Sequence, residues 1–164
     1  MRCTLLPIAI ALFADTAIAD LGDSVSRMAG RAGGIPYSAR AWKVPKLQVY
    51  AYRYKDLLNS IGVVGFSDGR AVIQLVFLTA EFIDQFPADQ VSTNIVNAFG
   101  GGSDWIQKGN DGKYEFWIRS NQTAFFAHKE RELILRDETW ANSLSSQDIQ
   151  QFISEATAWA QKAQ

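Results

Sequence analysis

A carboxylate, a tryptophan and the chain's one histidine lie close together in the second half of the sequence. Glu115 and Trp117 are two residues apart, so on a strand they would share one face. A carboxylate beside an indole ring can hold a sugar, and paired carboxylates can hydrolyse a glycosidic bond. This pattern predicts a small-ligand or glycan cleft, with weak hydrolase activity as a further option, formed by Trp105, Glu115, Trp117 and His128. The alternative is a solvent-facing strand row, because charge pairs across strands are common.

Other catalytic chemistries lack their sequence patterns. His128 is the one histidine, no H-E-x-x-H spacing occurs, and no G-x-S-x-G elbow supports a Ser/His/Asp triad. The glycines at 100–102 follow an expected helix instead of preceding one, so they form no phosphate cradle. The sequence therefore predicts no metal, no cofactor and no catalytic residue, and it favours a binding protein over an enzyme.

A second group combines aromatic and basic side chains. Residues 46–54 alternate in the period-two pattern of a strand, which places three tyrosines on one face. Tyrosine, tryptophan and arginine are the residues that dominate binding hot spots. The predicted binding residues are Arg40, Trp42, Lys43, Lys46, Tyr50, Tyr52 and Tyr54. If a helix covers the tyrosine face, however, that face is core, with hydroxyls reaching the rim. An exposed edge at 46–54 would also allow pairing with a second copy, so both a monomer and a homodimer are open.

The charge is divided between two parts of the chain. Residues 20–62 carry seven basic and three acidic side chains, and the residues from 63 onward carry eight basic and thirteen acidic ones. The two parts therefore differ in sign, at +4 (seven minus three) and −5 (eight minus thirteen). The basic part either binds an anionic surface or an acidic partner, or folds back onto the acidic part. Nucleic acid is excluded as a partner because the chain is not basic overall.

The N-terminus has the layout of a secretory signal peptide. Arg2 precedes an apolar run over 5–13, and Ala17-Ile18-Ala19 is an A-x-A cleavage site. Cys3, the one cysteine, lies inside this segment, so the mature chain from Asp20 would carry no thiol and no disulfide. A disulfide-free exported domain is typical of the bacterial periplasm, so the prediction is a periplasmic or secreted protein.

Hydrophobic periodicity and turn signals predict the elements that position these residues. Strands are expected over 46–54, 63–66, 70–78, 105–108, 113–119, 123–128 and 132–136, with short helices over 21–28 and 81–86 and one helical turn over 56–61. A longer helix is expected to end at the glycines 100–102, and an amphipathic one to begin at Ser145 or Ser146.

This order predicts an α+β fold with an antiparallel meander sheet of about six to seven strands. A mid-chain helix and the C-terminal helix are expected to pack on one face. The predicted organisation is a signal peptide over 1–19, a basic, partly flexible arm over 20–45, and one domain over 46–164. The predicted function is an exported, non-enzymatic module that binds a protein partner, as accessory, inhibitor or immunity proteins do. The alternative is the ligand-binding or glycan-binding protein described above.

Overall fold

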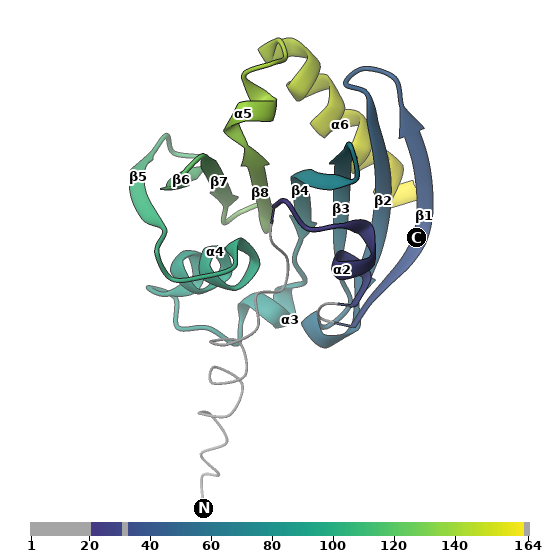
Figure 1. The fold of residues 1–164 in the computed structure, drawn as a ribbon. Coiled ribbons are helices and arrows are strands. Elements are labelled where there is room, and N and C mark those ends of the chain that lie inside the picture. The colour runs from purple at the N-terminus through teal and green to yellow at the C-terminus, as the bar shows by residue number, and fades with distance from the viewer. Residues whose placement is uncertain (1–20, 31–32, 163–164) are drawn as a thin grey trace, which may run out of the picture.

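The computed structural model describes residues 21–30 and 33–162, which build an antiparallel sheet with helices on both faces. The strand order is β1-β2-β3-β4-β8-β7-β6-β5, so β4 and β8 meet in the middle and β1 and β5 are the outer strands (Figure 1). The elements are α2 (Val25–Gly30), β1 (Gly34–Trp42), β2 (Leu47–Tyr54), the 3₁₀ turn η2 (Lys55–Leu57), β3 (Ser60–Ser67), β4 (Arg70–Phe77), α3 (Ala80–Ile83), α4 (Val91–Gly100), β5 (Ile106–Asn110), β6 (Glu115–Arg119), β7 (Gln122–Ala127), β8 (Glu132–Asp137), α5 (Glu138–Ala141) and α6 (Ser146–Lys162). No helix in these ranges is both long enough and apolar enough to cross a membrane.

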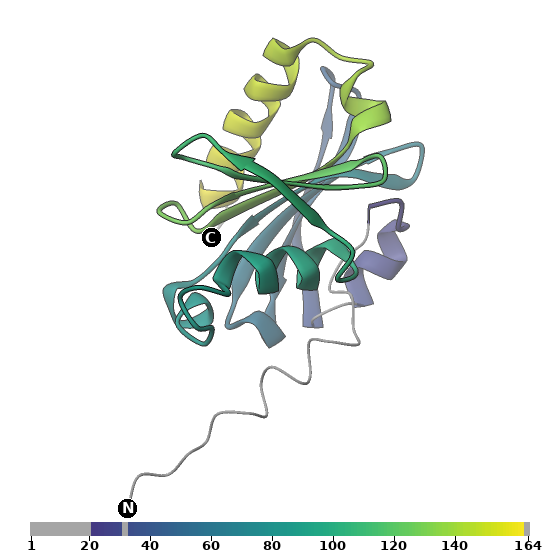
Figure 2. The ribbon, with the colours of Figure 1, turned by 90° about the vertical axis from the view of Figure 1, so that its left-hand side faces the viewer.

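The predicted α+β class and antiparallel meander, with a C-terminal helix packed on the sheet, are confirmed. Two details differ. The sheet has eight strands, and α4 and α6 lie on opposite faces of it (Figure 2). Every residue from Ser60 to Phe66 in β3 is buried, and a strand buried on both faces requires cover on both.

The additional strand comes from the segment that the sequence predicted as a basic, partly flexible arm. β1 occupies 34–42 and pairs antiparallel with β2 along its length, from Gly34 opposite Tyr54 to Trp42 opposite Leu47. Pro36 and a register shift between Pro36 and Ser38 interrupt the pattern near its start. These features are typical of an outer strand, where a missing N–H costs no ladder hydrogen bond.

Local signals explain where several elements begin and end. Asp68 and Gly69 both have positive φ, 50° and 77°, as the tight turn between β3 and β4 requires. Helix α4 ends at Gly100 and is capped by Gly101, which has a left-handed φ of 78° and whose N–H donates to the Asn97 carbonyl. Helix α6 begins at the predicted serine, because the Ser145 hydroxyl accepts from the Asp148 N–H at 3.1 Å.

The sheet face under α4 holds the larger aromatic core. Tyr52 and Tyr54 stack at 6.2 Å between ring centroids, and Phe99 of α4 contacts Tyr54 edge to face at 6.5 Å. The hydroxyl of Tyr54 reaches past Gly62 and accepts from Nε2 of Gln74 at 3.3 Å. Two strands, β2 and β4, are therefore joined by one side chain beneath the helix.

The opposite face is covered by α6. Its buried side chains pack against odd-numbered residues of the first strands, among them Leu47 and Val49. Trp42 of β1 contacts Phe152 and Trp159 of α6 with ring centroids 5.4 and 5.9 Å apart. The C-terminal helix thus fixes the outer strand β1 to the sheet.

Candidate functional site

The tyrosine row predicted as a binding face is mostly core. Tyr52 and Tyr54 are 0% exposed, and Tyr50 is half-buried against the same cluster. Of the two alternatives that the sequence left open, the structure supports the covered one. Tyr52 and Tyr54 therefore offer no surface to a partner.

Burial of these phenols predicts a loss of stability at alkaline pH. Burial, with a contribution from Tyr50, raises the pKa of Tyr52 to about 12, and burial also raises the pKa of Tyr54. An unfolded chain releases phenol protons near the ordinary value of about 10, whereas the folded chain retains them. The free energy of unfolding should therefore fall as the pH rises from about 10 through about 12. Ultraviolet phenolate absorbance followed beside circular dichroism checks this, and it is contradicted if all five tyrosines ionise while the circular dichroism stays native.

Removing the hydroxyl of Tyr54 or of Tyr52 by substitution with phenylalanine should change the free energy of unfolding differently. Tyr54→Phe leaves the buried Gln74 amide without its partner, so a loss of about 1–2 kcal/mol in the free energy of unfolding is expected. The Tyr52 hydroxyl is buried and has no hydrogen bond to a described residue, so Tyr52→Phe should be neutral or stabilising. Chemical denaturation of the two variants measures the difference. Equal losses in both would contradict the assignment of the hydrogen bond.

The structure corrects two other predictions for residues 40–54. Trp42, predicted to lie in the binding face, is 7% exposed and packs under α6. The predicted exposed edge at 46–54 is wrong, because β2 lies between β1 and β3. Self-pairing through that strand is therefore ruled out in this fold.

The basic residues of the prediction do lie on the surface. Arg40, Lys43 and Lys46 are exposed on β1 and the turn after it, and Arg53 is exposed on the neighbouring strand. We call these four residues the basic edge. None of them forms an ion pair with a residue in the described part of the chain. The alternative in which the basic part neutralises itself on the acidic body thus has no ion pair to support it within 21–30 and 33–162.

Two guanidinium groups of the basic edge are held against aromatic rings. Arg40 lies 4.6 Å from the Trp42 ring centroid, and Arg53 lies 5.9 Å from that of Tyr37. Stacking on a ring orients a guanidinium while leaving its N–H donors free for an anion. The exposed Val44, at 63%, lies in the turn between the two lysines. This combination of oriented cations with an apolar side chain suits a protein surface of opposite charge.

The predicted sugar platform is not accessible. Trp105 and Trp117 are each 6% exposed and belong to the core under α4. The guanidinium of Arg119 lies 5.1 Å from the Trp105 ring centroid. A buried indole face is unavailable for stacking on a sugar ring.

The other two residues of the predicted cleft do come together. Nε2 of His128 lies 3.6 Å from Oε1 of Glu115, and Gln107 donates to the other carboxylate oxygen at 3.2 Å. The His128 side chain is 48% exposed and that of Glu115 17%. The His128 ring also packs on Phe126 at 4.8 Å. These contacts make a cross-strand pair at the rim of the sheet, in line with the alternative interpretation of the row.

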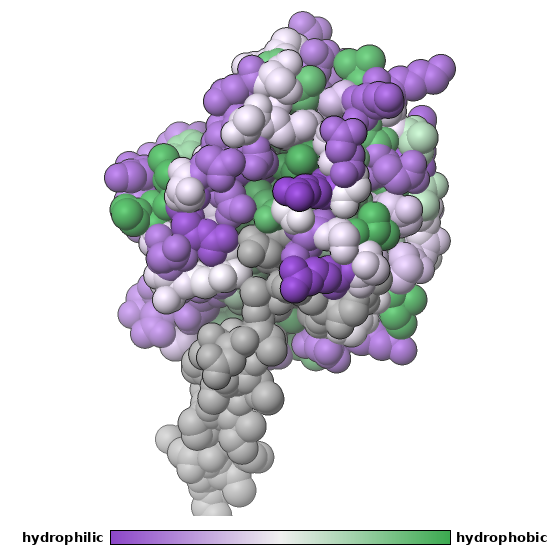
Figure 3. Space-filling view, viewed as in Figure 1, coloured by the Kyte–Doolittle hydropathy of each residue, from purple (hydrophilic) through white to green (hydrophobic). Residues whose placement is uncertain are grey.

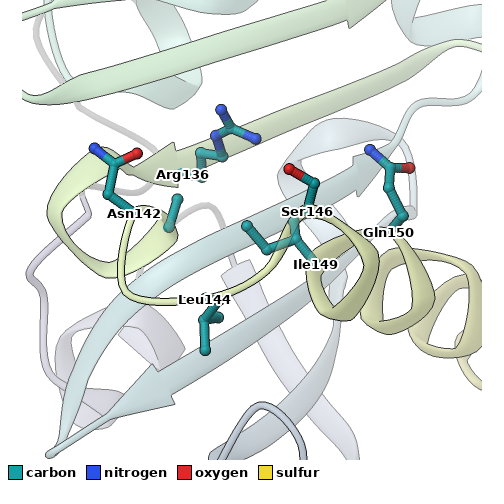
Figure 4. A pocket seen from close by; sticks show the side chains of 7 residues that line it. Arg136, Asn142, Leu144, Ser146, Ile149 and Gln150 are labelled. Atoms are coloured by element: carbon teal, nitrogen blue, oxygen red, sulfur yellow. The ribbon is translucent and has the colours of Figure 1, made fainter.

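A cavity of about 210 Å³ lies between β8, α5 and the start of α6 (Figure 4). Its one charged lining residue, Arg136, donates to both carboxylate oxygens of Glu138, at 2.7 and 3.4 Å. Polar lining also comes from Asn142, Ser146 and Gln150, whose side chains are drawn in Figure 4. Because the guanidinium already has a carboxylate, this cavity suits a small neutral polar molecule better than an anion. No group of three or more potential metal-ligating side chains occurs within the described ranges.

Exposed large apolar residues are few, and two of them, Ile106 and Ile118, are cross-strand neighbours. They are Ile35, Val44, Leu58, Ile106 and Ile118. On the face shown in Figure 3, hydrophobic side chains form small separate groups among hydrophilic ones. Charge, more than apolar area, therefore distinguishes one part of this surface from the rest.

Comparison of the chain with protein-family models, with curated proteins and with solved structures finds no match.

Two residues of the basic edge region were missed by sequence reasoning. Arg53 falls among the apolar odd-numbered residues of β2 and was counted only as a charge, although a cation ending an apolar row is itself a signal. Tyr37 was placed in the flexible arm, so its position beneath Arg53 was not expected.

Proposed function

We propose that this protein is an exported interaction module that binds an acidic protein partner through the basic edge. The observation that carries the proposal is that four exposed cations on one sheet edge have no ion pair among the described residues. Unpaired surface charge of one sign steers association with a partner of the other sign and sets its register. The module would act as accessory, inhibitor or immunity proteins do, and its partner would carry an acidic surface.

The test is capture of a partner from native extract with a charge-matched control. The chain from Asp20 is immobilised, and periplasmic and secreted fractions are passed over it at low and moderate salt. One variant reverses the basic edge to glutamate at Arg40, Lys43, Lys46 and Arg53. The control reverses four exposed cations elsewhere, Arg70, Lys108, Lys129 and Lys162, so that the net charge is equal.

The expected result is a stoichiometric acidic protein retained by the wild type and the control and lost from the basic-edge variant. Retention should weaken with salt, since exposed charges are screened within about 10 Å at 0.1 M ionic strength. Equal retention by both variants, or no protein retained by the wild type, would overturn the proposal.

The export part of the proposal rests on residues 1–19, which lie outside the described residues. Expression of the full chain in a bacterium and mass analysis of the periplasmic product test it. A mature N-terminus at Asp20 is expected. A full-length product retained in the cytoplasm would contradict export without affecting the basic edge.

A ligand-binding function is a second candidate, favoured by the cavity beside α6. Its lining of Asn142, Ser146 and Gln150 with Leu144 and Ile149 matches the mixed polar and apolar character of small-molecule sites. If the immobilised chain retained a small metabolite and no protein, the ligand-binding function at this cavity would be favoured over the basic edge. Gln150→Leu should then reduce that retention.

A further inference from the structure

The basic edge borders the backbone of an outer strand. β1 pairs with β2 on one side and is the end of the sheet order on the other. Pro36 and the register shift lie at its start, whereas the pairing from Ser38 to Trp42 is continuous. Ala39, Arg40 and Ala41 are exposed in this part. No described residue pairs with the outer side of β1.

The two sides of this strand differ in chemistry. On the side of α6, Arg40 is held against the Trp42 ring and lies opposite Val49 in register. On the side of α4, the small Ala39 lies opposite the half-buried Tyr50. A strand added next to β1 would therefore meet the Arg40 guanidinium on the α6 side of the sheet. On the α4 side it would meet Ala39, with the Tyr50 ring behind it.

We infer that the partner contributes an extended segment in which acidic and apolar residues alternate, and that it joins the sheet as a ninth strand along Ser38–Trp42. Main-chain hydrogen bonds to a sheet edge supply affinity in this mode, and alternating side chains supply specificity. The acidic residues face Arg40 and its neighbours, and the apolar residues pack over Ala39 and Tyr50. This inference rests on the proposed function, since it names how an acidic partner engages the basic edge.

The other outer strand is the natural competitor. β5 is five residues long, and a register shift between Gln107 and Gly109 interrupts it at Lys108. Bulges and an edge lysine are devices that prevent strand addition. Its exposed Ile106 is opposite Ile118, so an added strand would meet apolar side chains there, and the one cation of β5, Lys108, lies at the interruption.

The experiment uses a synthetic nine-residue peptide of alternating glutamate and valine as the probe. The same peptide methylated on its central amides cannot form the main-chain bonds, and a peptide with lysine for glutamate has the opposite charge. Binding is measured by calorimetry, and amide hydrogen exchange is followed along β1. The glutamate peptide should bind, slow exchange at alternate residues of Ser38–Trp42, and bind about tenfold or more better than either control peptide.

Protein variants complete the test. Arg40→Glu should lose the glutamate peptide and gain the lysine peptide, whereas Lys108→Glu should bind as the wild type does. Equal binding of the methylated peptide, or protection in β5 instead of β1, overturns strand addition. So does failure of every peptide to bind. These results leave the proposed function standing if the captured partner still depends on the basic edge, and loss of that dependence overturns both.

Discussion

Replacing Gly62 with alanine is expected to lower the free energy of unfolding by about 2–3 kcal/mol, because the site has no room for a methyl group. A Cβ at this position would overlap Cε2 of Tyr54 and lie 2.7 Å from its hydroxyl oxygen. The ring cannot move aside easily, since it stacks on Tyr52, contacts Phe99 and is bonded to Gln74. Total stabilities of about 5–15 kcal/mol are usual, so this loss is large.

Gly109→Ala is the matched control for this variant. A Cβ at Gly109 meets no atom within 4 Å, and its backbone is not in the left-handed region. Surface changes of this kind usually alter stability by less than about 0.5 kcal/mol. Denaturant titration of both variants gives the comparison. Similar midpoints for the two would show that Tyr54 does not cross the sheet above Gly62.

Most strands were predictable because their signals are local. The alternation over 46–54 and the apolar content over 63–66 and 70–78 depend on a few adjacent residues, and these strands are present as β2, β3 and β4. β1 was not predicted because Pro36 and the register shift hide its alternation. The placement of helices on both faces was also missed, although the β-branched and apolar content of β4, interrupted only by Gln74 within 71–77, is typical of a strand covered on both faces.

At the candidate site, the exposure of the charged residues could be predicted from the sequence, but the exposure of the aromatic residues could not. A tyrosine row looks the same in sequence whether solvent or a helix lies above it. Tyr52 and Tyr54 are core because residues of α4 and α2 belong to the same buried cluster. Charge is more readily predicted, because an unpaired cation is seldom buried. Arg40, Lys43 and Lys46 were accordingly placed on the surface correctly, whereas Trp42 between them was not.

Trp42→Ala is expected to be the most destabilising change in the region first predicted as a binding face. The indole fills the space between β1 and α6, contacting Phe152 and Trp159. Removing a buried aromatic side chain typically costs about 3–5 kcal/mol, and here it also removes the ring against which Arg40 lies. Thermal and denaturant unfolding measure the loss. Trp42→Phe should retain much of the stability, because a ring remains against α6.

Arg40→Glu provides the contrast that separates stability from binding. Arg40 is exposed and loses one ring contact, so its replacement should lower the free energy of unfolding by less than about 1 kcal/mol. Under the proposed function, its effect on partner capture should nevertheless exceed that of Trp42→Phe, since the Arg40 side chain is exposed and the indole faces the core. If Arg40→Glu instead destabilised the fold as much as Trp42→Ala, the guanidinium would be part of the packing of β1. Arg40 and Trp42 would then share one structural role, and the basic edge would no longer be supported as a binding surface.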